Sequence, residues 1–140
     1  INLHAPALLP SDYCSDVQER LTLYKRLANC EADDDLLALQ EELIDRFGEM
    51  PGQARTLLET HRLRMLVKPY GVQKLDASES QITVQFGKDA AIDPVKVIML
   101  IQKDKSTRMS GPDKLIRKIA TPELKERVAA VKTLLDAVKA

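Results

Sequence analysis

The segment from Gln81 to Phe86 constrains the fold more than any other part of the sequence. Its residues alternate between polar and apolar, the period of two that places every second side chain on the same face of a β-strand. A lone strand leaves its backbone N–H and C=O groups without partners, so a second strand must lie nearby. Residues 72–75 are suitable, because only the polar turn at 76–80 separates them from the first segment. The sequence therefore predicts a small antiparallel sheet in the second half of the chain.

The first half of the chain shows helical spacing of its apolar residues. We predict helices over 16–29, from the acidic run 33–35 to a stop at Gly48, and from Pro51 to about residue 70. Ser15 and the acidic run are the expected N-caps of the first two helices, and proline suits the first position of the third. The expected buried faces comprise Val17, Leu21, Tyr24 and Leu27, then Leu36, Leu39, Leu43 and Phe47, then Ala54, Leu57, Leu58, Met65 and Leu66.

The remaining segments complete the predicted fold. Asp93 and Pro94 predict a helix that runs to residue 102, and residues 107–109 and 115–119 are short strands separated by a turn signal at 111–113. Thr121 and Pro122 are expected to cap a last helix, which carries apolar residues from Leu124 to Val138, and prolines keep residues 1–10 extended. The predicted fold class is α+β, with several helices packed on a small antiparallel sheet in a single domain.

Motifs and composition argue against an enzyme and against a membrane span. The longest apolar run, residues 97–101, is far shorter than the ~20 residues that a span needs. No phosphate-binding loop, zinc-protease motif or nucleophile elbow occurs. His4 and His61 are far apart, and Cys14 and Cys30 are expected to be reduced thiols, with a disulfide as the less favoured alternative. We therefore predict no catalytic residue, no metal site and no cofactor, in a cytoplasmic protein without a signal peptide.

The charges balance in sum but not in position. The chain has 21 Lys and Arg against 21 Asp and Glu, without the basic bias that is usual in nucleic-acid-binding proteins. Residues 31–49 hold eight acids and one base, whereas residues 103–118 hold six bases and two acids. The six bases form a candidate basic patch: Lys103, Lys105, Arg108, Lys114, Arg117 and Lys118.

Three charged residues stand out on the acidic helix. Glu42 and Arg46 are four residues apart and Asp45 is adjacent, which places them together on the helix. We expect them to point away from the apolar side of that helix. One interpretation is a solvated face with an ion pair that contributes a few tenths of a kcal/mol. The other is a docking face, where charges set specificity and the rate of approach.

An ordered series of motifs resembles one known family. The series is P-A-L-L-P-S-D-Y at 6–13, R-L-T-L-Y-K-R at 20–26 and E-L-I-D-R-F-G-E-M-P at 42–51, with further likeness at 57–58, 63–64 and 71–75 and looser likeness at 93–94 and 110–112. It resembles the C-terminal domain of bacterial transcription-repair coupling factor (Mfd), the translocase that clears stalled RNA polymerase and recruits excision repair. The likeness covers nearly the whole chain.

The resemblance implies a regulatory domain over residues 1–140, cut from a longer chain and without chemistry of its own. The parent would be an ATP-dependent DNA translocase whose motor and whose contacts to RNA polymerase and DNA lie in other domains. In this family the domain packs against the UvrB-like N-terminal module and covers the surface that binds UvrA, its competitor. The E-L-x-D-R motif contributes to that contact, so the resemblance assigns this role to Glu42, Asp45 and Arg46. The alternative is an accessory domain of the translocase that contacts nucleic acid through the basic patch.

Overall fold

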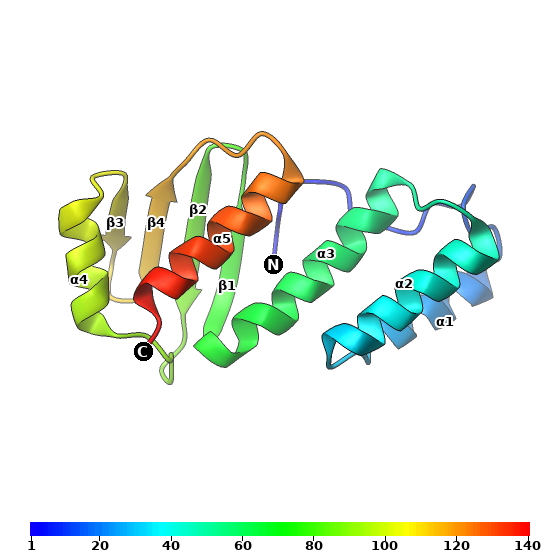
Figure 1. Cartoon of the computed structure of the whole chain (residues 1–140), viewed down its shortest axis with the longest axis horizontal. Coiled ribbons are helices and arrows are strands. Elements are labelled where there is room, and N and C mark those ends of the chain that lie inside the picture. The colour runs from blue at the N-terminus through cyan, green and yellow to red at the C-terminus, as the bar shows by residue number, and fades with distance from the viewer. The chain divides into compact units, whose positions relative to one another are not determined.

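Three consecutive helices form the first half of the chain, as the apolar spacing predicts (Figure 1). They are α1 (Val17–Ala28), α2 (Asp33–Phe47) and α3 (Gly52–Val67), followed by a short 3₁₀ turn η1 (Lys68–Tyr70). The computed structural model describes all residues from 1 to 140. The chain forms two compact units. Residues 5–65 form the helical unit, and residues 1–4 together with 66–140 form the sheet unit.

The caps of the first two helices differ from the prediction by one residue. Asp16, not Ser15, caps α1, because its carboxylate accepts a hydrogen bond of 3.0 Å from the N–H of Gln18. Ala32 occupies the N-cap of α2, so the acidic run lies inside the first turn. There its negative charge still faces the positive end of the helix dipole. Gly48 ends α2 with a φ of 89°, as expected for a helix stop.

The core of the helical unit forms where α1 and α2 pack together. Leu23 and Leu27 of α1 are buried with the apolar side of α2. Val17 and Leu21 were predicted on this side but are exposed, because α1 buries Leu27 of the predicted face together with Leu23 beside it. On α3 the predicted Ala54 and Leu58 are buried, joined by Thr56, His61 and Leu63, whereas Leu66 is at the surface.

The sheet unit contains the predicted antiparallel strands. They are β1 (Val72–Ala77), β2 (Gln81–Phe86), β3 (Thr107–Ser110) and β4 (Lys114–Lys118), in the order β1-β2-β4-β3. The register aligns Leu75, Val84 and Leu115 across three strands, and all three are buried. The α+β fold class with an antiparallel sheet is therefore confirmed, and the strand bounds differ from the prediction by at most two residues.

Gly71 makes the turn into β1 possible. Its φ is 72°, in the left-handed region that favours glycine, and a Cβ there would lie 2.7 Å from the Cα of Ala90. The chain therefore needs glycine here both for backbone conformation and for close approach.

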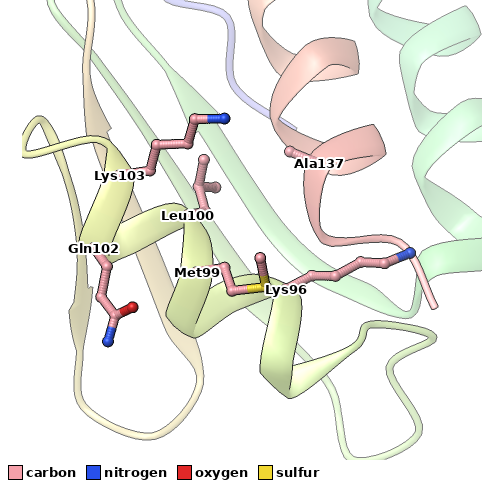
Figure 2. A pocket seen from close by; sticks show the side chains of 6 residues that line it. All are labelled: Lys96, Met99, Leu100, Gln102, Lys103 and Ala137. Carbon is pink, nitrogen blue, oxygen red and sulfur yellow. The ribbon is translucent and has the colours of Figure 1, made fainter.

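Two helices complete the sheet unit: α4 (Pro94–Lys103) and α5 (Leu124–Val138). Figure 1 shows α5 running across one face of the sheet, and buried apolar residues line its inner side from Val128 to Val138. Asp93 caps α4 as predicted. Between α4 and α5 lies a groove of about 450 Å³ (Figure 2), lined by Lys96, Met99, Leu100, Gln102, Lys103 and Ala137.

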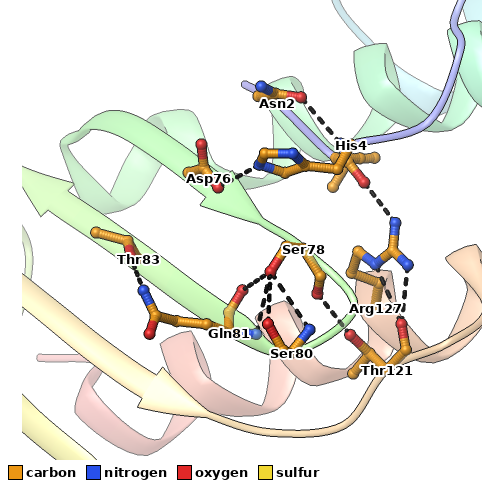
Figure 3. Close-up of polar contacts among 10 residues, drawn as sticks. Asn2, His4, Asp76, Ser78, Ser80, Gln81, Thr83, Thr121 and Arg127 are labelled. Carbon is orange, nitrogen blue, oxygen red and sulfur yellow. Dashed lines mark hydrogen bonds and ion pairs between the residues drawn. The ribbon is translucent and has the colours of Figure 1, made fainter.

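A buried arginine on α5 fastens the first residues of the chain to the sheet unit. Arg127 was not expected in the apolar face, yet it is buried and donates hydrogen bonds to the carbonyl groups of Leu3 and Thr121 (Figure 3). Thr121 is not the helix cap that its position suggested. Its hydroxyl donates to the Ser78 carbonyl at 2.9 Å, and Glu123 stands at the N-cap instead.

Candidate functional site

Two of the three charged residues singled out on α2, Glu42 and Arg46, form ion pairs with α1. Arg26 of α1 donates hydrogen bonds to both carboxylate oxygens of Glu42, with Nη2 and Oε1 2.9 Å apart. Arg46 pairs with Glu19 of α1 and also with Glu42, its Nη1 lying 3.4 Å from Oε2. Four charges of alternating sign therefore link the two helices. Glu19 and Arg26 were not among the predicted site residues.

The Arg26–Glu42 ion pair favours the charged forms of both groups. The hydrogen bond from Arg26 lowers the pKa of the Glu42 carboxyl and raises the pKa of the guanidinium that donates it. Because the pKa of Glu42 is depressed in the folded chain, the contribution of the pair to stability is complete above the ordinary pKa of a glutamate carboxyl and persists to lower pH. It is lost as acidification protonates Glu42. Both side chains are partly exposed, so the pair orients them more than it stabilises the fold.

The three residues of the E-L-I-D-R motif therefore have different surroundings. Arg46 does not point away from Phe47 as expected, since its guanidinium carbon lies 4.9 Å from the centre of the Phe47 ring, a cation–π distance. Glu42 is half-buried between its two arginine partners. Asp45 is exposed and forms no ion pair. Asp45 is thus the motif residue whose charge is free to meet a partner.

The structure divides the candidate basic patch between separate places. Arg117 lies opposite Ile82 on the covered face of the sheet and pairs with Asp104 at 3.0 Å. Lys103 ends α4 and lines the α4–α5 groove. Lys105 lies in the turn before β3. The six bases therefore do not form one surface, because the strands turn alternate side chains to opposite faces.

The remaining bases gather on the sheet face opposite the buried leucines. Lys114 and Lys118 alternate with buried Leu115 along β4. The register places Lys74 across from Gln85 and Gln85 across from Lys114, in one row over three strands. A cleft of about 420 Å³ lies beside this row. We call Lys74, Arg108, Lys114 and Lys118 the basic sheet surface. Lys74 was not part of the predicted basic patch.

The histidines and cysteines have structural rather than chemical roles. His61 is buried, with its Nε2 3.1 Å from the carbonyl oxygen of Cys30. His4 pairs with Asp76 at 2.6 Å. Both cysteines are free thiols, and burial raises the pKa of Cys30, which keeps it protonated and unreactive. No group of three or more potential ligands is positioned to hold a metal ion. None of the helices has the length and apolarity required to cross a bilayer.

Comparisons with known proteins agree with the motif series. A family model described as the TRCF domain matches residues 3–97. The transcription-repair-coupling factor of Haemophilus influenzae is 44% identical over 115 residues, covering 81% of this chain and 10% of that protein. Its counterpart in Escherichia coli is 39% identical over 116 residues, covering 82% of this chain and 10% of that protein. The chain thus spans about a tenth of the length of these curated relatives.

The fold also matches a solved structure. A crystal structure described as the C-terminal domain of transcription-repair coupling factor superposes with a TM-score of 0.77 at 24% identity, covering 98% of this chain and 91% of that one. This match extends past residue 97 and includes the last helix. The superposition supports the fold alone, whereas the family model covers more than half of the sequence. On that ground the chain belongs to the TRCF domain family.

Proposed function

We propose that residues 1–140 form an autoinhibitory regulatory domain of a transcription-repair coupling factor. The domain would dock on the UvrB-like module of the same parent chain and mask the surface that UvrA binds. It would have no catalytic activity of its own and would act in the cytoplasm. Family membership supports this proposal, and the exposed charge of Asp45 beside the paired Glu42 and Arg46 is the observation that carries it.

The mechanism is a shift between a closed and an open population. In the closed state the α2 motif residues contact the UvrB-like module, and in the open state that module is free for UvrA. Glu42 and Arg46 are already oriented by Arg26 and Glu19, so docking costs little further side-chain ordering. A polar contact of this kind opens more readily than a large apolar interface. This suits a switch that engagement with stalled polymerase must release.

Titration of this chain against the separate UvrB-like module tests the docking step. We expect weak binding that weakens further with salt, because the contact rests on exposed charges. Asp45→Arg should lower the affinity by about fivefold or more, since it reverses the one motif charge that has no ion-pair partner within the chain. Asp12→Arg is the matched control, because Asp12 is an exposed acid of the same unit outside the motif. Equal affinities for both variants would remove Asp45 from the contact.

A second candidate function is favoured by the basic sheet surface. Lys74 and Lys114 flank Gln85 in one row, two strand spacings or about 10 Å apart, a separation that suits contact with neighbouring backbone phosphates. No aromatic side chain lies among these residues, so binding would follow the phosphate backbone rather than base stacking. This candidate corresponds to an accessory domain that contacts nucleic acid.

Salt-dependent binding of a short DNA duplex tests this second candidate. Four phosphate contacts would give a slope of log affinity against log salt of about −3 to −4, and loss of Lys114 should flatten the slope by about one unit. Lys114→Gln is therefore compared with Lys105→Gln, a change at an exposed base outside the surface. Absence of measurable binding at low salt, or equal slopes for the two variants, would eliminate this candidate.

A further inference from the structure

The helix α4 exposes three large apolar side chains. Val95, Ile98 and Met99 are 62%, 55% and 61% exposed, whereas Val97 is the buried residue of this helix. Their spacing of three and four residues places them on one side of α4. A contiguous set of large apolar side chains on one exposed helix is a common feature of interaction sites.

The groove beside this exposed side has a definite charge. Lys96 and Lys103 line it together with Met99, and none of its lining residues is acidic (Figure 2). The Nζ of Lys96 donates a hydrogen bond of 2.9 Å to the Lys139 carbonyl, which holds this ammonium at the rim. The two lysines are seven residues apart, or about 10 Å along the helix axis. The groove therefore fits an apolar ridge flanked by two acids at the same separation.

The helix α2 carries such a ridge. Leu37 and Ile44 are exposed large apolar residues, at 49% and 45%. Asp34 and Glu41 are exposed acids seven residues apart, each three residues before one of them. At 100° per residue these four side chains share one side of α2, away from the side that meets α1 through Glu42. We call them the α2 ridge.

The two helices match in spacing and are opposite in charge. On α4, Met99 follows Lys96 by three residues and Lys103 follows Lys96 by seven. On α2, Leu37 follows Asp34 by three residues and Glu41 follows Asp34 by seven, so the spacing is the same. We propose that the α2 ridge of one copy of this chain docks in the α4–α5 groove of a second copy. This self-association does not rest on the proposed function and uses none of the motif residues Glu42, Asp45 and Arg46, although Asp45 follows Glu41 by four residues on the same side of α2.

The contact is expected to be transient. Two helix faces bury less area than the roughly 1,200 Å² at the lower end of stable interfaces, so association should appear at concentrations of about 100 μM rather than in dilute solution. The two surfaces differ from one another, so the contact is of the head-to-tail type. A two-fold dimer can contain it twice, and otherwise it extends into longer assemblies.

Sedimentation equilibrium of this chain over rising concentration tests the proposal through charge reversal. The groove variant is Lys96→Glu with Lys103→Glu, and the ridge variant is Asp34→Lys with Glu41→Lys. Each alone should lower the association constant by about tenfold or more, because like charges then face each other. An equimolar mixture should regain association, since the acidic groove of one variant then meets the basic ridge of the other.

The matched control is Lys125→Glu with Lys132→Glu. These exposed lysines of α5 are also seven residues apart but do not line the groove, so this variant should associate like the unmodified chain. Lys103→Glu alone provides a milder groove variant, and circular dichroism verifies folding of each. A monomer at every concentration, association unaffected by the variants, or failure of the mixture to recover would overturn the proposal. The groove variant leaves α2 unchanged, so its result is independent of binding to the UvrB-like module through Asp45.

Discussion

Replacing Leu43 with alanine is expected to lower the free energy of unfolding of the helical unit by about 2–5 kcal/mol, the range for removing a buried leucine side chain and leaving a cavity. Leu43 is 2% exposed and belongs to the same core cluster as Leu23 and Leu39. Its carbonyl accepts a hydrogen bond from the Tyr13 hydroxyl at 3.1 Å, which fixes the backbone around the cavity and limits its collapse.

The neighbouring residue supplies the control for this experiment. Ile44 is 45% exposed, so Ile44→Ala should change the free energy of unfolding by less than about 1 kcal/mol. Urea denaturation followed by circular dichroism measures both variants. A midpoint for Leu43→Ala equal to that of Ile44→Ala would contradict the described packing of α2.

In the full-length parent protein, changing Glu42, Asp45 and Arg46 together to alanine is expected to raise the apparent affinity for UvrA. Loss of the docking contact shifts the population toward the open state, and apparent affinity scales with the competent fraction. If about 1% of the molecules are open beforehand, the gain can reach ~100-fold. The measurement is a UvrA binding isotherm for the variant beside the unmodified protein, since this chain alone lacks the module that UvrA would bind.

This triple change also removes the ion pairs to α1, so its control must separate the two effects. Glu19→Ala with Arg26→Ala breaks the same pairs from the α1 side but keeps the α2 motif residues. If docking is responsible, the control should raise UvrA affinity much less than the triple variant. Equal gains would attribute the effect to a loosened hairpin of α1 and α2, and no gain in a folded triple variant would leave these residues as a solvated helix face.

Local periodicity predicted the helices and strands well. Which side of a helix is buried depends on the elements packed against it, and the sequence does not show which elements these are. The alternation at Gln81–Phe86 became β2 without change, because the pattern and the pleat have the same period. Val17, Leu21 and Leu27 have the spacing of one buried face, yet of these three only Leu27 is buried, together with Leu23. An apolar stripe shows that a helix can pack on that side, and only its neighbour decides whether it does.

The candidate site shows the same limit for charges. The i,i+4 relation of Glu42 and Arg46 is local and was predicted correctly. Their stronger partners, Arg26 and Glu19, come from another helix 16 residues or more away, and nothing local to either helix indicates that pairing. By contrast, the alternation along β4 separates Arg117 from Lys114 and Lys118 locally, and the register opposite Ile82 adds that Arg117 lies on the covered face.

The hydrogen bonds around the first four residues have a consequence for how the chain is connected. Asn2 exchanges backbone hydrogen bonds with Leu75 and Ala77, at 2.9 and 2.8 Å, and Leu3 accepts from Arg127. The helical unit is therefore an insertion, entered after residue 4 and left at residue 66, with both crossings anchored in the same sheet unit. Such an insertion can open locally while the flanking segments keep its ends tethered. Tension applied to the backbone at residue 1 is then borne first by the sheet unit, and the helices stay unloaded until that anchor yields.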